Sequence, residues 1–254
     1  PSTGNIDSPG HLTIRGSVRA GFSVTAHGGL EVGGGLEHCS VTVQGDLVVK
    51  EGILGTPGTC VQASGTVTAR YAENARILCG KDLLLERSAM HCQLTARGSI
   101  YVSGNLISGS AVACKRIEAR NLGSPIGTPL HLCLGYTPEV CDALDQIFSE
   151  RVQVERQHWE LAEALIRLGG VAFLKHRDVH RIPEGKREDA RRLLTGIANV
   201  EKTVAGLIHR QNELVRDKQA EEPDAALAFS GELHTDVWVN LGPHSMRFFD
   251  KLQG

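Results

Sequence analysis

Apolar residues recur in four columns through the first half of the chain, around anchor positions spaced 12 to 20 residues apart. The anchors are Gly16, Gly28, Gly45, Gly65, Lys81, Gly98 and Lys115. Apolar residues fill the positions two and four before and two and four after every anchor, 28 of 28 in a chain that is 41% hydrophobic. Alternate side chains of an extended chain share one face. Each copy therefore predicts two short strands that bury one face and meet at the anchor.

The anchor itself is glycine in five of the seven copies. This predicts a corner where a side chain would collide with the interior or where φ is unusual. One rung cannot bury its apolar face alone, whereas stacked rungs share a continuous core. The first half thus predicts a β-solenoid. We expect the right-handed parallel β-helix, because the left-handed hexapeptide form needs strict six-residue units.

The second half changes from period 2 to a heptad pattern. Thr137 and Pro138 predict a helix start, and Gly169-Gly170 predicts its end. Each predicted helix carries two mainly apolar columns with heptad spacing. In the first helix they are Val140, Ile147, Val154, Leu161 and Leu168, beside Leu144, Arg151, His158 and Leu165. In the second helix, after Pro183, they are Leu193, Val200, Leu207 and Leu214, beside Ala190, Ile197, Val204 and Gln211. Heptads of this kind are typical of coiled coils. Two such helices joined by a short segment predict an antiparallel hairpin.

The segment 229–242 returns to period-2 alternation. We expect these strands to pair with the last rung and to cover its open edge. The fold class is therefore mainly β with a long helical hairpin. The expected domains are a β-solenoid over 1–134, an antiparallel coiled-coil hairpin over 135–225, and C-terminal strands over 226–254 that return to the solenoid.

Composition narrows the classes of function. The net charge is −2 and no basic stripe is present, which argues against a nucleic acid partner. No apolar run approaches the length of a membrane span, and no signal peptide is evident. Seven cysteines without a CxxC pair predict reduced thiols in a cytoplasmic protein.

The cysteines divide by their place in the repeat. Cys39, Cys79 and Cys92 have inward parity and are expected to pack as small hydrophobes, without a metal or redox role. Cys60 and Cys114 have outward parity and are expected to be accessible thiols, although nothing beside them predicts activation. We therefore expect no metal and no cofactor.

The expected tip of the hairpin is the one locally basic patch, formed by Lys175, His176, Arg177, His180 and Arg181. His176 and His180 have helical i, i+4 spacing, but a metal pair without a third ligand is less favoured than a solvated face. We expect this patch to bind a protein partner.

An ordered series of short motifs resembles the flagellar assembly protein A family over nearly the whole chain. The matching segments are 3–6, 14–32, 34–37, 52–55, 69–75, 122–124 and 231–237. Lys81 and Lys115 depart from the family's usual glycine, and His234-Thr235-Asp236 replaces a Tyr-Pro-Gly-like turn. Because the family's separate N-terminal domain has no counterpart before Pro1, we expect the chain to be part of a longer protein.

The resemblance implies a non-enzymatic cytoplasmic scaffold or regulatory factor in bacterial flagellar assembly that acts through protein–protein contacts. The implied partners are the polar flagellar machinery or its regulators, together with further copies of the chain. Two alternatives stay open. One is a polymer-forming solenoid of the bactofilin kind, since exposed rung ends can add rungs. The other is a carbohydrate-active β-helix enzyme, for which Asp46 and Asp82, in one column, are the candidate acids. We expect no catalytic residue, because the acids of the solenoid are scattered.

Overall fold

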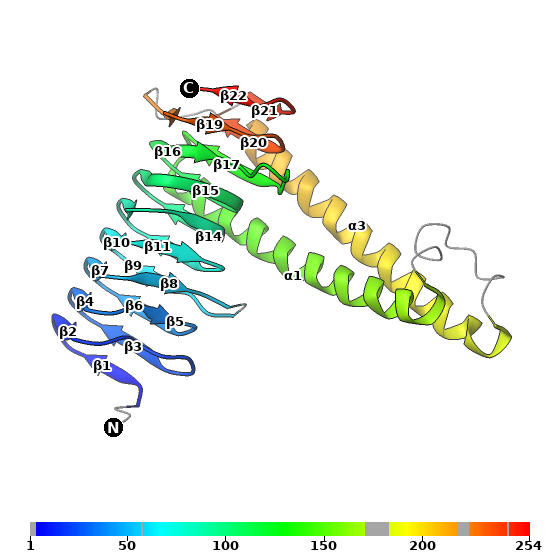
Figure 1. The fold of residues 1–254 in the computed structure, drawn as a ribbon, viewed down its shortest axis with the longest axis horizontal. Helices are drawn as coiled ribbons and strands as arrows, with labels where there is room; N and C mark the ends of the chain where they lie inside the picture. Colours follow the sequence, from blue (N-terminus) through cyan, green and yellow to red (C-terminus); the bar gives the residue numbers. More distant parts are fainter. Residues whose placement is uncertain (1–3, 57, 171–182, 218–223, 243) are drawn as a thin grey trace. The chain divides into compact units, whose positions relative to one another are not determined.

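The computed structural model describes residues 4–56, 58–170, 183–217, 224–242 and 244–254. The chain forms two compact units, each described by itself: the first comprises residues 1–145 and 215–254, and the second comprises 146–214. The fold is mainly β, with a β-solenoid of about eight turns and two long helices. The strands stack in chain order from β1 to β20 (Figure 1).

Three columns of parallel strands form the faces of the solenoid. The first contains β1(Ile6–Ser8), β3(Ser23–Ala26), β6(Ser40–Val43), β9(Val61–Ala63), β12(Arg76–Cys79), the end of β14(Ala89–Ala96), the end of β15(Ile100–Ala113), β17(Leu130–Leu134) and β20(Val237–Leu241). The second contains β2(Leu12–Ile14), β4(Leu30–Val32), β7(Leu47–Val49), β10(Val67–Ala69), β13(Leu83–Leu85), the start of β15, β16(Arg116–Leu122) and β18(Ala226–Phe229).

The third face contains β5(Leu36–Glu37), β8(Gly52–Leu54), β11(Tyr71–Glu73), the start of β14, the middle of β15, the end of β16 and β19(Glu232–Leu233). Two last strands reverse direction: β21(His244–Phe248) pairs antiparallel with β20, and β22(Leu252–Gln253) pairs antiparallel with β19. Most strands have two to five residues, and the longer β14, β15 and β16 each run through more than one face, so the faces meet at frequent corners.

The four apolar columns form the core. Of their 28 positions, 25 are buried, whereas Leu12 and Ile14 are half-buried and Ala20 is exposed. All three exceptions belong to the first copy, whose predicted register is wrong. Leu12 pairs with Leu30 and Ile14 with Val32, which places these residues after a corner at Gly10 rather than before Gly16.

Close approach of successive rungs explains the corner glycines. A Cβ at Gly45 would stand 3.0 Å from the backbone of Gly28, and one at Gly65 would stand 2.8 Å from the backbone of Gly45. Neither glycine has a positive φ. Glycine is thus required at these two corners because a side chain would collide with the preceding rung, and not because the backbone angle is unusual.

The helices are inserted at one corner of the solenoid, between β17 and β18. Helix α1(Pro138–Gly169) begins and ends where the sequence predicts, with the Cys141 amide donating to the Thr137 carbonyl oxygen. The short 3₁₀ helix η2(Glu184–Lys186) follows Pro183 and leads into α3(Arg187–Asp217). After α3, β18 pairs with β16 and β20 pairs with β17, each in parallel.

Within the second unit, the two helices share a small apolar core. Leu165, Ala190 and Ile197 are buried there, and Leu161, Leu168, Leu193 and Leu194 pack against them. Glu150 forms an ion pair of 3.1 Å with Arg210, and His158 lies 3.7 Å from Glu201.

Candidate functional site

The basic patch predicted for partner binding, Lys175, His176, Arg177, His180 and Arg181, lies outside the described residues. The candidate site is therefore assembled from the polar and titratable side chains of the described ranges. In those ranges no group of three or more His, Cys, Asp or Glu side chains is arranged to hold a metal ion.

A buried polar cluster joins the start of α1 to the first face of the solenoid. One oxygen of Asp145 accepts a 2.5 Å hydrogen bond from Arg76 of β12, and the other accepts a 2.9 Å bond from Thr95 of β14. Asp145 is only 4% exposed. One turn earlier, Asp142 pairs with Arg97 at 2.6 Å in a solvent-exposed position. These two ion pairs fix the helix start to consecutive rungs.

Thiols gather under the same part of α1. The sulfurs of Cys114 and Cys141 lie 3.2 Å apart, and both residues are buried. Cys133 is also buried and accepts a 3.5 Å hydrogen bond from the Asn240 side chain. The prediction that Cys114 is accessible is wrong, because α1 covers the face toward which its side chain points. Cys60, the other outward cysteine, is half-buried.

Burial makes the core thiols weak acids. Desolvation raises the pKa of Cys39 and of Cys92 from 9.0 to about 11, and that of Cys79 and of Cys133 to about 12. For Cys39 and Cys92, backbone hydrogen bonds act in the opposite direction but more weakly. Thiolates are the reactive form of cysteine. The predicted inward packing of Cys39, Cys79 and Cys92 is confirmed by their burial, and their raised pKa values keep these thiols protonated at neutral pH.

We expect these thiols to make the fold sensitive to alkali. The folded thiols keep their protons above pH 9, whereas the unfolded ones lose theirs, so stability is full below pH 9 and falls as pH rises toward 12. Each thiol contributes about 1.4 kcal/mol per pH unit in this window. Urea unfolding at pH 7.5 and at pH 10.5 gives the free energy of unfolding at each pH. Its decrease between the two pH values should be smaller for Cys79→Ala than for the unchanged chain. Equal losses in the two proteins would contradict this assignment.

The two aspartates considered for carbohydrate chemistry have structural partners. Asp46 Oδ1 accepts a 2.7 Å hydrogen bond from the Thr66 amide of the next rung, and Asp82 Oδ1 accepts one of 2.7 Å from the Ser99 amide. These bonds satisfy backbone donors at corners that would otherwise depend on water. The shared column of the two acids therefore reflects a repeated corner contact.

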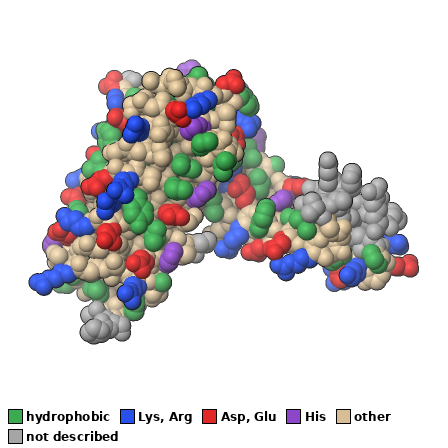
Figure 2. All heavy atoms as spheres, in the orientation of Figure 1, with side chains coloured by type: hydrophobic (Ala, Val, Ile, Leu, Met, Phe, Trp, Pro, Cys, Tyr) green, Lys and Arg blue, Asp and Glu red, His purple; other side chains and the backbone are tan. Residues whose placement is uncertain are grey.

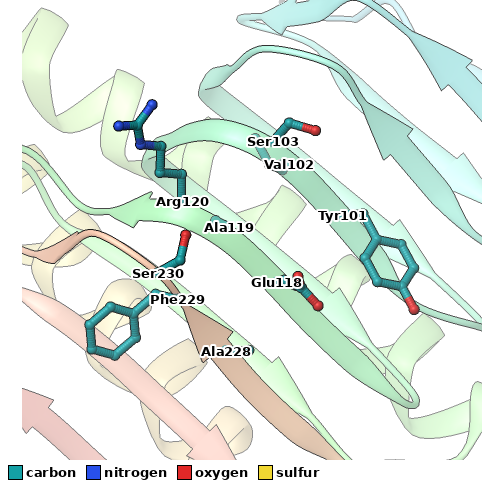
Figure 3. Close-up of a pocket in the computed structure, with 9 residues that line it drawn as sticks. All are labelled: Tyr101, Val102, Ser103, Glu118, Ala119, Arg120, Ala228, Phe229 and Ser230. Carbon is teal, nitrogen blue, oxygen red and sulfur yellow. The ribbon is translucent and has the colours of Figure 1, made fainter. Parts of the chain in front are cut away.

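A shallow groove of about 300 Å³ opens on the second face, where a register shift interrupts the pairing of β15 and β16. Its lining includes Tyr101 and Ser103 from β15, Glu118 and Arg120 from β16, and Phe229 from β18. Figure 3 shows the Arg120 guanidinium extending away from the Glu118 carboxylate. Among the described lining residues Glu118 is the sole acid, so the groove lacks the carboxylate pair that glycoside hydrolysis normally uses. It offers an aromatic and polar contact surface.

The last turn of the solenoid carries an aromatic cluster around Arg247. The guanidinium of Arg247 lies 4.4 Å from the ring centroid of Trp238 and 4.8 Å from that of Phe249. Asp236 accepts hydrogen bonds of 3.0 and 2.6 Å from the same guanidinium. These contacts hold β21 against β20 and leave Phe249 69% exposed.

The charged side chains are mixed in sign. Figure 2 shows Lys and Arg side chains interspersed with Asp and Glu side chains over the visible face.

No helix in the described part of the chain has the length and hydropathy needed to cross a membrane.

Comparison with known protein families gives a match over the whole chain. The profile described as the Flagellar Assembly Protein A beta solenoid domain matches residues 1–254. No curated protein and no solved structure matches the chain. The profile extends over the solenoid strands, both helices and the C-terminal strands.

Proposed function

Because the chain belongs to the flagellar assembly protein A beta-solenoid family, which implies a role in flagellar assembly, we propose that it is a non-enzymatic cytoplasmic scaffold. It acts through protein contacts with the flagellar machinery or its regulators at the cell pole. The observation that carries this proposal is the use of the solenoid's polar side chains in corners and helix docking. Asp46, Asp82 and Asp145 all have such structural partners.

The proposal includes the finer architecture. The solenoid is right-handed over 1–134, an antiparallel coiled coil spans 135–225, and the strands of 226–254 complete the solenoid. The antiparallel arrangement is supported by the Glu150–Arg210 and His158–Glu201 contacts, since numbers rise along α1 as they fall along α3. Leu161 and Gly196 continue this series, with the Leu161 Cδ1 atom 3.2 Å from a Cβ built on Gly196.

The filament alternative is less well supported. Addition of a further parallel rung requires a free parallel edge, and β21 and β22 occupy the C-terminal end of the first and third faces in antiparallel orientation. An incoming β1 would therefore meet a reversed strand. The enzyme alternative lacks a pair of free acids in the described groove, and Asp46 and Asp82 serve the corners.

The basic patch of the hairpin provides the test of the scaffold role. Replacing Lys175, Arg177 and Arg181 together with alanine is expected to reduce capture of flagellar proteins from cell extract about tenfold or more, because partner binding through a basic patch depends on charge. Recovered proteins would be quantified by mass spectrometry. The circular dichroism spectrum should not change.

A matched variant controls for the loss of three positive charges. Lys186, Arg192 and Lys202 lie on the described part of the hairpin and can be replaced by alanine in the same way. This variant should retain full capture. Undiminished capture by the Lys175, Arg177 and Arg181 variant would reject the patch as the partner site.

A further inference from the structure

Each long helix carries a second apolar column beside the one that forms the shared core. On α1 it consists of the residues that follow the heptad seam: Phe148, Val152, Trp159, Ala162 and Ile166. On α3 the corresponding column contains Ala198, Ala205 and Ile208, whereas Leu194 before them packs against the shared core. Glu155 and Glu201 interrupt these columns once each. A helix that packs against a single partner needs only one such stripe.

The two second columns lie on the same side of the hairpin. Both helices are right-handed and run in opposite directions in an antiparallel pair. The residues one position after the seam residues therefore lie on the same side of the pair in both helices. The ion pair of Glu150 with Arg210 fixes which residues of the two helices lie opposite each other, and it places Val152 opposite Ile208. We define the flank face by Val152, Trp159, Ala198, Ala205 and Ile208.

The flank face is open to solvent. Trp159 is 72% exposed, Val152 is 49% exposed and Ile208 is 40% exposed. Ala198 and Ala205 are exposed as well. Isolated surface hydrophobes are ordinary, but an aromatic and two aliphatic side chains aligned on one flank mark a contact site.

The earlier part of the α1 column already serves as a packing surface. Cys141 and Asp145 precede Phe148 in the same column, and in the first unit they contact Cys114, Arg76 and Thr95. The flank face uses the same heptad positions of α1 further along the sequence. Val152, Trp159 and Ile208 are not among the residues of the described two-helix core.

Charge and shape favour a second copy as the occupant. The helical segments 146–169 and 187–214 carry eight acidic and eight basic side chains, so two copies do not repel each other. The small Ala198 and Ala205 side chains leave space beside the bulky Trp159, as knobs-into-holes packing requires. Many core residues of the two-helix pair, such as Val154 and Val200, are only half-buried, which is typical of a bundle that lacks its other helices.

We propose that two copies of the chain join through the flank face into an antiparallel four-helix bundle, with Trp159 of each copy packed beside Ala198 and Ala205 of the other. The proposal rests on the antiparallel pairing included in the proposed function. The face covers about 300 Å² per copy, because Ala198 to Ile208 spans about 15 Å along α3 and two helices side by side are about 20 Å wide. Because this is below the usual interface size, we expect a dimer with a dissociation constant in the micromolar range.

Sedimentation of the full chain at about 1 to 100 μM tests the dimer directly. The unchanged chain should pass from monomer to dimer in this range. Trp159→Lys should raise the dissociation constant about 100-fold or more, because each interface contains the residue twice and central tryptophans dominate binding. Gln157→Lys introduces the same charge on the opposite flank, where Gln157 is exposed, and should leave the dissociation constant unchanged.

A second measurement keeps the test independent of folding defects. Trp159 and Trp238 are the two tryptophans of the chain, so Trp238→Phe makes emission report on Trp159 alone. Its emission should shift to shorter wavelength as the concentration rises. A chain that stays monomeric at 100 μM, or a dimer that survives Trp159→Lys, would overturn the proposal. Loss of the dimer with retained capture of flagellar proteins would leave the proposed scaffold function intact.

Discussion

Replacing Asp145 with alanine is expected to lower the free energy of unfolding by about 3 kcal/mol. Removal of one member of a buried ion pair costs about 3–5 kcal/mol, because the other charge is left without a partner. The lower end applies here, since the Arg76 side chain is 34% exposed and can reach water. The change also removes the acceptor of the Thr95 hydroxyl, and Thr95 is a residue that is only 3% exposed.

Urea unfolding followed by circular dichroism would measure this loss. Asp142→Ala provides the matched control, because Asp142 lies one turn earlier on α1 and pairs with Arg97 from the neighbouring rung. Both side chains of that pair are about half exposed, so its loss should cost about 1 kcal/mol or less. Similar losses in the two variants would show that burial does not set the strength of the Asp145 contact.

Gly109→Ala is expected to destabilise the solenoid by about 3 kcal/mol or more. Gly109 has φ +94°, and a left-handed backbone angle costs other residues about 1–3 kcal/mol. A Cβ there would also stand 2.1 Å from the Cys92 carbonyl oxygen of the preceding rung. A backbone atom cannot move aside without breaking the ladder between the two rungs, so the two costs add.

Gly16→Ala is the matched control for this change. Gly16 has no positive φ, and no atom lies within 4 Å of a Cβ at that position. The substitution should be neutral or should stabilise by about 0.4–1 kcal/mol through the unfolded chain. Thermal unfolding of both variants would separate these outcomes. Unchanged stability in Gly109→Ala would mean that the corner adjusts without strain.

The repeat pattern predicted the solenoid because the core columns obey strict parity. It failed at the first rung, where Ser8 takes the position that Ala26 holds in the next rung. Because Ser8 is polar, the apolar pattern places Ile14 in the column of Ala26, and the predicted first copy is shifted by one strand. The short spacing of 12 residues between Gly16 and Gly28 was the sign of this error, since Gly10 gives 18.

Parity also could not show which outward side chains are covered by another element. Thr95, Val112 and Cys133 point outward from the first face, as Cys114 does at its end, yet all four are buried. The position of Val112, an apolar residue in an outward column, was one available signal. The other was the column of Cys141, Asp145 and Phe148 beside the heptad seam, which predicts that α1 has a second partner.

The sequence pattern also did not predict the corners that follow the strands of the third face. His38, Asn74, His91 and Ser108 have φ between 50° and 56°, at equivalent places after the strands of the third face. Asparagine and histidine tolerate this region better than most residues. Because their side chains differ so widely, no column of common chemistry connects them, and only the backbone shows the repeat.

The insertion of the helices between β17 and β18 sets an order of events during synthesis. Rungs up to β17 contain local contacts between strands about 17 to 21 residues apart, so they can form as the chain emerges. The strand β18 must wait until 91 further residues, 135–225, have been made, and it then pairs with β16 across that gap. Early pairing of α1 with α3 would bring the two ends of this segment together and reduce the entropy lost when the last turn closes. The rate at which the two helices pair would then determine how soon β18 and the strands after it complete the last turn of the solenoid.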